Sequence, residues 1–279
     1  MSNKILVSGV TTCFLLSHLA LFGALSGCGK KSKDENEEAA PEIPASETLV
    51  MSTSSLQSGG NLTTSAGANF GVAYLTVSAT SVAVALQLAL PAAAISKALE
   101  QTAKKEGDGS WSWIYSFVHS GTSYNAILKA TTGTGASLWD WALGVSKSPL
   151  DSNGCCTNFT WLSGSRTSAT SGVWTINDAA APASISPLRT VDWQYTSATD
   201  KSLKVGLSKV DDSTSEWAAG GYVKLAISGA ANVMTIDKTP VNAATIVVNW
   251  DSSTKVGSMV KEDGTKVCWD TSLADVTCP

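Results

Sequence analysis

The sequence has little of what metal chemistry, acid–base catalysis and nucleic-acid binding usually need. Two of the 279 residues are histidines, and one of these, His18, lies in an apolar N-terminal stretch. Charged residues make up 15% of the chain, the formal net charge is −4, and no basic stripe is present, which excludes a generic nucleic-acid binder. A Gly-x-Ser-x-Gly turn, a glycine-rich phosphate loop and a His-Glu-x-x-His pair are also absent. We therefore expect no metal site, no cofactor and no catalytic residue.

Apolar side chains, by contrast, are abundant. Hydrophobic residues make up 43% of the chain, which also holds 23 glycines and 10 tryptophans. A chain of this length and composition can bury the core of one large or two small domains, and it is too apolar to be disordered throughout.

The first 28 residues have the pattern of an export signal. Lys4 supplies a positive charge, and residues 5–25 form an apolar stretch interrupted by small or weakly polar side chains. This stretch is more interrupted than a membrane-spanning helix, and it lies at the N-terminus. It ends in Leu25-Ser26-Gly27-Cys28. Here the sequence resembles bacterial lipoprotein precursors, whose lipobox is an aliphatic residue, two small residues and a cysteine.

The resemblance implies a lipid anchor. Type II signal peptidase would cleave between Gly27 and Cys28, and the Cys28 thiol would then carry diacylglycerol, usually with a further acyl chain such as palmitate on the new amine. Several long chains, at about 0.8 kcal/mol per buried methylene, hold a protein on a membrane where one chain does not. Gly29 follows the cysteine, and no aspartate there resembles an inner-membrane retention signal, so we expect the outer membrane of the bacterial cell envelope. The alternative is an ordinary secretory signal that contains a cysteine by chance.

Residues 29–70 are predicted to be a flexible tether. The segment is first basic, then acidic with Pro41 and Pro44, and finally rich in Ser, Thr and Gly, without a period of 2 or 3.6. The acidic run resembles surface-export signals of some bacterial lipoproteins, or it only keeps the tether soluble. Without Lys4 the mature chain has 18 basic and 23 acidic residues, a net charge of −5, and should not bind an anionic surface by charge.

The remaining residues, 71–279, are predicted to form a helix followed by an antiparallel β domain. Residues 81–105 are the helix candidate, with Pro91 expected to kink or divide it and Gly107 to end it. Residues 77–95 could be misinterpreted as a membrane span, but Gln87, Pro91 and many alanines give little transfer free energy. A helix that packs against a sheet, or fills the mouth of a barrel, is the favoured interpretation.

After residue 109 the period changes to two. Trp111, Trp113, Tyr115 and Phe117 fall on one face of a strand, and eleven further segments are similar. The twelve candidate strands are residues 111–118, 124–130, 139–145, 157–162, 172–176, 190–195, 202–208, 221–228, 232–237, 244–250, 256–261 and 265–270. Short links join them, and no helices lie between them. The fold class is therefore mainly β: an antiparallel meander of roughly twelve short strands, closed as a barrel, curled as a half-barrel around the helix, or packed as a sandwich.

Two local patterns constrain the pairing. Asp263-Gly264 predicts a two-residue hairpin turn, which would place Val260 opposite Val267. Tryptophans are followed by glycines at several points, as in Trp250 and Gly257, which indicates a loosely repeated hairpin.

Four cysteines remain once the leader is removed and Cys28 is acylated: Cys155, Cys156, Cys268 and Cys278. Export to an oxidising compartment favours disulfides, and four cysteines allow three pairings. We favour Cys268 with Cys278, which would fasten the C-terminus to the last strand, and a vicinal bridge between Cys155 and Cys156. A cross-pairing between the two groups is the competing arrangement. The spacing suits neither a zinc site nor a thioredoxin-like site.

The tryptophans are the candidate binding residues. Trp111, Trp113, Trp139 and Trp141 would be neighbours if their strands pair. They would then form hydrophobic core, or line a cavity or groove that holds an acyl chain or stacks on a sugar ring.

The leading hypothesis is thus a non-enzymatic, lipid-anchored envelope protein, either structural or binding a lipid or another apolar molecule within a curved sheet. A surface module that binds glycans or proteins through exposed tryptophans is the alternative. A hydrolase is third, because the spacing of a glycosidase carboxylate pair is set in three dimensions. His119, at the end of an aromatic strand, is interpreted as a rim or turn residue.

Overall fold

The computed structural model describes residues 38–57, 66–150, 152, 155–180, 182–183, 185–208, 217–238 and 244–279. Ala40–Pro279 form one compact unit. The predicted leader with Cys28, and residues 29–37 of the predicted tether, lie outside the described residues.

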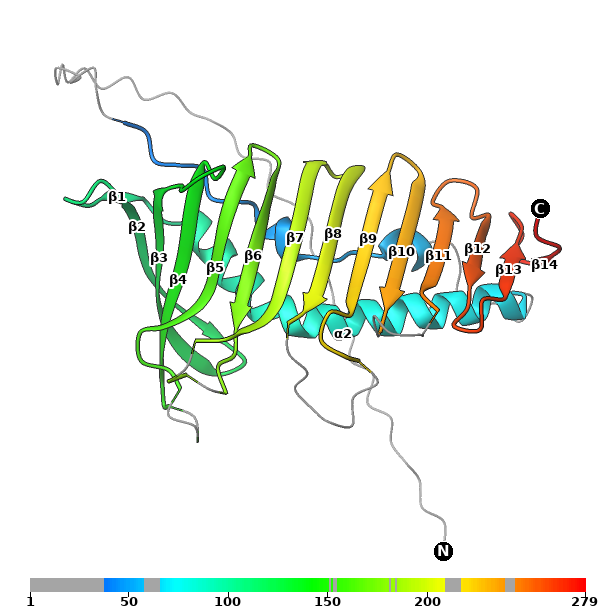
Figure 1. Cartoon of the computed structure of the whole chain (residues 1–279), viewed down its shortest axis with the longest axis horizontal. Coiled ribbons are helices and arrows are strands. Elements are labelled where there is room, and N and C mark those ends of the chain that lie inside the picture. Colours follow the sequence, from blue (N-terminus) through cyan, green and yellow to red (C-terminus); the bar gives the residue numbers. More distant parts are fainter. Residues whose placement is uncertain are drawn as a thin grey trace, which may run out of the picture. The chain divides into compact units, whose positions relative to one another are not determined.

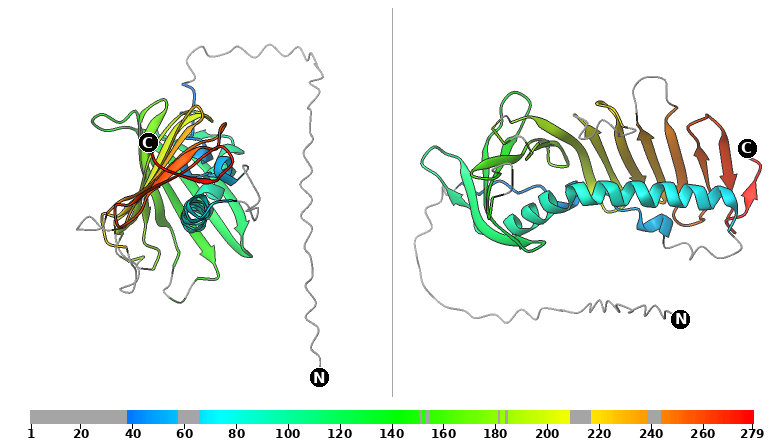
Figure 2. Two further views of the ribbon diagram at one scale, coloured as in Figure 1. Left: turned by 90° about the vertical axis from the view of Figure 1, so that its right-hand side faces the viewer. Right: turned by 90° about the horizontal axis from the view of Figure 1, so that it is seen from below.

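In the described part of the chain, fourteen antiparallel strands form one sheet, and each strand pairs with its neighbours in the sequence (Figure 1). The strands are β1 (Lys104–Lys105), β2 (Trp111–His119), β3 (Thr122–Thr132), β4 (Trp139–Ser148), β5 (Phe159–Ser168), β6 (Ser171–Asn177), β7 (Pro187–Ser197), β8 (Asp200–Leu207), β9 (Tyr222–Ser228), β10 (Ala231–Asp237), β11 (Ile246–Asp251), β12 (Gly257–Val260), β13 (Lys266–Trp269) and β14 (Asp275–Val276). The sheet is open, because β1 and β14 do not pair, and it curves around the long helix α2 (Ala68–Leu99) (Figure 2). The predicted mainly β meander is confirmed, in its half-barrel form.

The twelve predicted strands correspond to β2–β13. Their period of two is visible in β2, where Trp113 and Tyr115 are buried while Ile114 is 63% exposed. The two further strands, β1 and β14, have two residues each, which is too short for a period to show. They form the edges, and short edge strands limit pairing with other chains.

The curl of the sheet has a local cause in its strand register. The register shifts in four consecutive strand pairs, from β4–β5 to β7–β8. Such irregularities add an unpaired residue, bend the strand and increase its right-handed twist. The meander therefore wraps around α2 instead of lying flat.

Helix α2 begins thirteen residues before the predicted start at Ser81. Its first turns contain Gly71 and β-branched residues, which are weak helix formers, so the sequence pattern missed them. Tertiary contacts stabilise them instead: Phe70 is 2% exposed and Val77 is fully buried. At the N-terminus the carboxylate of Asp275 accepts a hydrogen bond from the Asn69 N–H at 2.9 Å, which caps the helix from the last strand.

Pro91 does not divide the helix, contrary to one form of the prediction. It lies inside α2 and is buried, and Leu88, Ala94 and Ile95 around it are also buried. Packing on both sides of the proline offsets the cost of a proline inside a helix, about 3 kcal/mol for the lost backbone hydrogen bond and the clash of the ring together. Among the described residues, α2 is the one helix that is long and apolar enough to cross a membrane. Helices buried in the core of a protein can have the same length and composition.

The predicted tether is wrong for residues 40–57, which belong to the core. Ile43, Leu49, Met51 and Leu56 are all buried. The segment includes the 3-10 helix η1 (Ser46–Leu49) and the short helix α1 (Ser54–Gln57). Its composition is polar and without a period, so its four buried apolar side chains give no recognisable pattern. Residues 58–65 of the predicted tether lie outside the described residues.

Three tryptophans lie over glycines on the neighbouring strand. The directly opposed pairs are Gly164 with Trp174, Gly172 with Trp193, and Gly257 with Trp269. At each of these glycines a Cβ atom would lie under 3.0 Å from the indole ring. The alternation of Trp and Gly in the sequence therefore reflects cross-strand packing rather than a repeated hairpin unit.

The last hairpin differs by one residue from the prediction. Val260 pairs with Lys266, and Met259 pairs with Val267. The Lys261 N–H donates to the Thr265 carbonyl at 3.0 Å, so the loop is Glu262-Asp263-Gly264, with Gly264 at φ 79°. A three-residue loop that ends in a left-handed glycine is a common hairpin form, and it changes the register by one.

The favoured pairing of Cys268 with Cys278 is confirmed: a disulfide joins Cys268 of β13 to Cys278 near the C-terminus. Cys155 and Cys156 are both buried, and the vicinal bridge between them stays a prediction. Asp275, which caps α2, lies within the loop closed by the Cys268–Cys278 disulfide. The disulfide thus also fastens the capping strand.

Candidate functional site

A groove of about 530 Å³ lies between α2 and the concave face of the sheet. Its helix side is formed by Thr76, Ala79, Thr80, Ala83, Val84 and Gln87, and its sheet side by Arg189, Val205, Leu207, Trp217, Val223, Ile236, Lys238 and Ile246. The site therefore joins one helix to five successive strands, β7–β11.

The floor of the groove is a straight row of apolar side chains. Val205, Val223, Ile236 and Ile246 come from β8–β11 and are directly opposed from strand to strand. Strands lie about 4.8 Å apart, so the row extends about 14 Å. All four side chains are at most 8% exposed, so the row is also part of the core.

The helix wall has a matching length. Residues 76–87 of α2 line the groove, and a rise of 1.5 Å per residue gives about 16 Å. Their spacing of three and four places these side chains on one face of the helix. Because α2 crosses the strands along the row, the groove is long and narrow, a shape that suits an extended apolar molecule.

Arg189 places a charge at one end of this apolar groove. It begins the core-facing side of β7, and its side chain is buried. Its Nε donates to Oε1 of Gln87 at 3.0 Å, and its Nη1 donates to the Leu188 carbonyl at 2.9 Å. The guanidinium thereby fixes the position of α2 over β7 and gives the groove a polar end. Buried arginine is rare unless it is hydrogen-bonded, and these bonds meet that requirement.

The rim of the groove carries further polar groups. Lys238, just after β10, forms an ion pair with Glu262 at 2.8 Å. Thr76 and Thr80 add hydroxyl groups on the helix side, and Trp217 is half-buried. An apolar floor with a few polar groups at the edges is the usual composition of a small-molecule site.

The four predicted tryptophans lie at the other end of the half-barrel. Trp111, Trp113 and Trp141 are at most 8% exposed, and Trp139 is half-buried. Their strands do not pair directly, since β3 lies between β2 and β4, but small Ala130 separates Trp111 from Trp141. The rings of Trp113 and Trp141 lie 5.6 Å apart. These indoles form core, not an exposed stacking platform.

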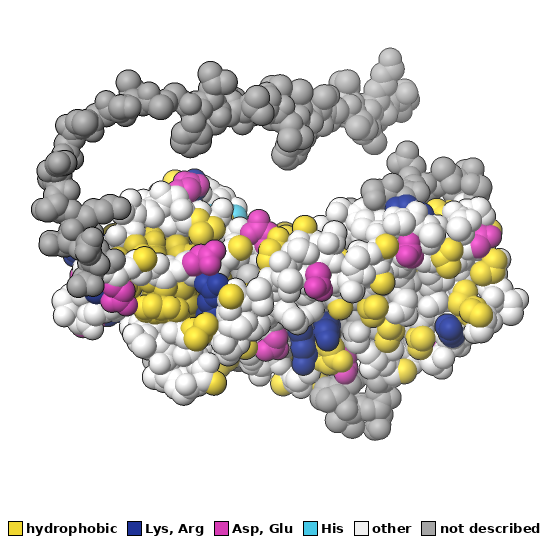
Figure 3. All heavy atoms as spheres, turned by 90° about the horizontal axis from the view of Figure 1, so that it is seen from above, with side chains coloured by type: hydrophobic (Ala, Val, Ile, Leu, Met, Phe, Trp, Pro, Cys, Tyr) yellow, Lys and Arg dark blue, Asp and Glu magenta, His cyan; other side chains and the backbone are white. Residues whose placement is uncertain are grey.

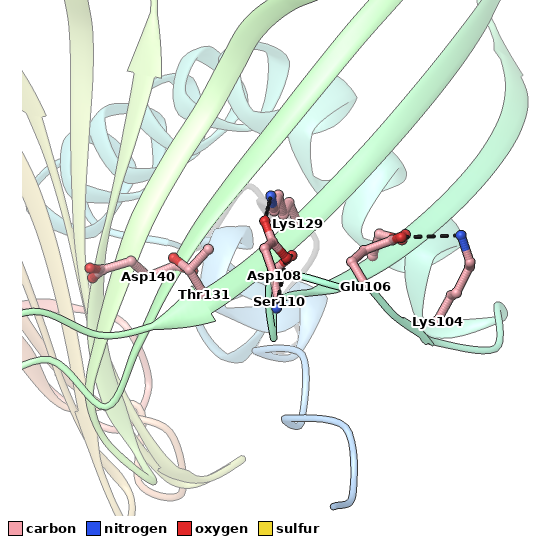
Figure 4. Close-up of polar contacts among 8 residues, drawn as sticks. Lys104, Glu106, Asp108, Ser110, Lys129, Thr131 and Asp140 are labelled. Atoms are coloured by element: carbon pink, nitrogen blue, oxygen red, sulfur yellow. Dashed lines mark hydrogen bonds and ion pairs between the residues drawn. The ribbon is translucent and has the colours of Figure 1, made fainter.

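Charged side chains gather beside this end of the sheet. From above, hydrophobic side chains cluster toward the end formed by β1–β5, with acidic and basic side chains next to them (Figure 3). The close-up shows Lys104, Glu106, Asp108, Ser110 and Lys129 as one polar cluster (Figure 4). Lys129 pairs with Asp108 at 2.9 Å, and Lys104 pairs with Glu106 at 3.1 Å.

The carboxylates of this cluster are stabilised in their charged form. Hydrogen bonds from Ser110, then the ammonium of Lys129, lower the pKa of Asp108. The Ser112 hydroxyl, and then Lys104, lower the pKa of Glu106. A general acid at neutral pH needs a raised pKa instead, so the cluster is not suited to acid catalysis.

Within the described residues, His119 and Asp263 lie toward opposite ends of the sheet and are not brought together. His119 is half-buried at the end of β2, next to the turn at Ser120 and Gly121. Asp263 lies in the last hairpin, and hydrogen bonds from Thr265 lower its pKa. Asp211-Asp212, a pair of adjacent carboxylates in a predicted turn of the sequence, lies outside the described residues. Among the residues that are described, no group of three His, Cys, Asp or Glu side chains is placed to hold a metal.

The chain matches no protein-family model, no curated protein and no solved structure.

Sequence reasoning did not find the groove. One signal was available: Arg189 is in phase with Val191 and Trp193, which face the core, so a charge stands on the buried face of a strand. The position of the groove depends on which residues of α2 lie over which strands. These contacts are set by the start of α2 and by the strand register, and the sequence pattern predicted neither correctly.

Proposed function

We propose that this protein is a non-enzymatic lipoprotein of the bacterial outer membrane, anchored through Cys28, that binds an apolar ligand in the groove between α2 and β7–β11. The observation that supports binding is the 530 Å³ groove, with its continuous apolar floor and polar end. The lipobox-like Leu25-Ser26-Gly27-Cys28 supports the anchor. The burial of Trp111, Trp113 and Trp141 makes the groove a better candidate than a tryptophan platform for glycans.

Binding can be tested with the chain that lacks its leader, residues 29–279, and a series of fatty acids that displace an apolar fluorescent probe. Each methylene that enters the groove contributes about 0.8 kcal/mol, so affinity should rise about fourfold per methylene until the groove is full. Lipid that co-purifies, detected by mass spectrometry, would identify a natural ligand. Displacement curves that do not depend on chain length would contradict an apolar groove.

The groove can be blocked by one substitution. Ala83 lines the groove from an exposed position on α2, so Ala83→Trp should fill part of it without disturbing the core. We expect at least a tenfold loss of probe affinity, about 1.4 kcal/mol. Ala85→Trp is the matched control, since Ala85 is also exposed on α2 but does not line the groove. Equal affinity in both variants would exclude this groove as the binding site.

The anchor is tested separately in cells given radiolabelled palmitate. We expect the wild-type chain to incorporate the label and to lose residues 1–27, and Cys28→Ser to incorporate none, because the thioether needs the thiol. Cys13→Ser, within the predicted leader, should incorporate the label normally. Label retained in Cys28→Ser, or an unlabelled wild-type chain, would contradict the anchor.

A further inference from the structure

The outward face of α2 is apolar although it is exposed. Val72 is 43% exposed, Leu75 60%, Val82 57% and Leu86 75%. The helix has no charged residue before Lys97. Seen from below, α2 lies in front of the sheet along most of its length (Figure 2). Large exposed apolar patches mark interaction sites, so we expect this face to be covered.

The exposed apolar residues form a regular stripe. Successive members are separated by three, four, three, four and three residues, the spacing of a helix-pairing seam. We define the outer stripe as Val72, Leu75, Ala79, Val82, Leu86 and Ala89, all of which are exposed. The buried residues of α2, such as Val77 and Leu88, lie on other faces.

The outer stripe is nearly palindromic. When a second α2 lies antiparallel across it, centred between residues 80 and 81, Leu75 of one copy faces Leu86 of the other. In the same arrangement Val72 faces Ala89, and Ala79 faces Val82. Each larger residue outside the leucine pairs therefore meets an alanine, which allows two helices to approach closely. In a dimer with two-fold symmetry, the same surface patch of each copy contacts the other, so the patch must be complementary to itself. The outer stripe has this property.

The chemistry of the stripe does not suit a lipid surface. Helices that lie on membranes carry Lys and Arg on their polar face and aromatic residues on their apolar face. The outer stripe contains no aromatic residue, the first cation of α2 is Lys97, and the mature chain is net acidic. Aliphatic and alanine side chains alone, in register with themselves, fit a second helix better.

We propose that two copies of this protein pair antiparallel through the outer stripe of α2. The outer stripe shares Ala79 with the edge of the groove, and its other five residues do not line the groove. One helix face is smaller than the roughly 800 Å² per partner of a standard interface, so we expect a dimer that dissociates on dilution. Anchoring on one membrane would raise the local concentration and favour pairing.

The test is sedimentation of the chain 29–279, which keeps the whole compact unit Ala40–Pro279. We expect the wild type to form dimers as the concentration rises, and Leu75→Glu or Leu86→Lys alone to remain monomeric. Both leucines are mostly exposed, so neither change disturbs the core, and circular dichroism should match the wild type. A wild type that stays monomeric at every concentration would overturn the proposal.

Mixing the variants tests the geometry. In an antiparallel pair, Glu at 75 of one copy faces Lys at 86 of the other, and the second contact keeps both leucines. A mixture of Leu75→Glu with Leu86→Lys should therefore restore the dimer. A mixture of Leu75→Glu with Leu75→Lys should stay monomeric, since those positions do not meet.

The opposite pattern in the two mixtures would indicate parallel packing and overturn the antiparallel proposal. Vesicles of a zwitterionic phospholipid provide the last arm of the test. A monomer that binds these vesicles and loses binding in Leu86→Lys would assign the stripe to lipid, and the pairing of two copies would be rejected.

Discussion

Trp269→Ala is expected to lower the free energy of unfolding by about 3–5 kcal/mol, the usual cost of emptying a large aromatic site. The Trp269 side chain is fully buried, and its ring meets that of Phe70 edge-on at a centroid distance of 5.8 Å. Its indole N–H donates to the Lys255 carbonyl at 2.7 Å. The ring also covers Gly257, so its loss opens the contact between α2 and the last strands. Urea unfolding followed by circular dichroism measures the change.

The same site explains why a glycine is needed. A Cβ at Gly257 would lie 2.1 Å from Trp269 Cζ2 and 2.5 Å from the Asn249 carbonyl oxygen, so Gly257→Ala should cost about 1–3 kcal/mol. Gly144→Ala in β4 is the matched control, because its nearest atom would be 3.9 Å away, and we expect little change. In the Trp269→Ala variant the ring contact is absent. The double variant should therefore lose less stability than the sum of the Trp269→Ala and Gly257→Ala losses. Equal effects at Gly257 and Gly144 would mean that the indole does not pack tightly on the glycine.

These pairs illustrate what the sequence could predict. Period-two alternation predicted the segments that form β2–β13, and it is clearest where a strand buries one face, as β2 does with Trp113 and Tyr115. Alternation does not determine register, however. The predicted register of the last hairpin was wrong by one residue, because the loop has three residues rather than two. Because alternation leaves the register open, the sequence showed that tryptophans and glycines alternate, but it did not show which glycine lies opposite most of the tryptophans.

The missed features have a common physical origin in tertiary packing. The first turns of α2 contain weak helix formers and are stabilised by contacts such as that of Phe70 with Trp269. Residues 40–57 contain too few apolar side chains to show a period, although four of these side chains, Leu49 among them, are buried in the core. The groove could not be predicted without the start of α2, because its position depends on where α2 begins and on which strands α2 crosses.

Removing residues 40–57 should have the largest effect of all. Four of their apolar side chains are buried, and burial of each contributes about 1.5–3 kcal/mol. Two buried tryptophans also donate to this segment: Trp174 to the Thr48 hydroxyl and Trp250 to the Ser55 hydroxyl, each at 3.1 Å. A chain that begins at residue 58 should thus lose more than about 5 kcal/mol, which is comparable to the whole stability of many domains. We expect it to lose its cooperative unfolding transition.

A chain that begins at residue 38 lacks residues 29–37 of the predicted tether but keeps the core segment 40–57, so it tests the two parts separately. If the tether ends there, this chain should unfold at the same urea concentration as residues 29–279, because it keeps every described contact of the segment. Within it, Leu49→Ala should cost about 2–5 kcal/mol, since Leu49 is 1% exposed. Its neighbour Val50 is 45% exposed, and Val50→Ala should change stability by no more than about 0.5 kcal/mol. Equal effects at the two positions would mean that the segment is not inserted as described, and that the tether extends into residues 40–57.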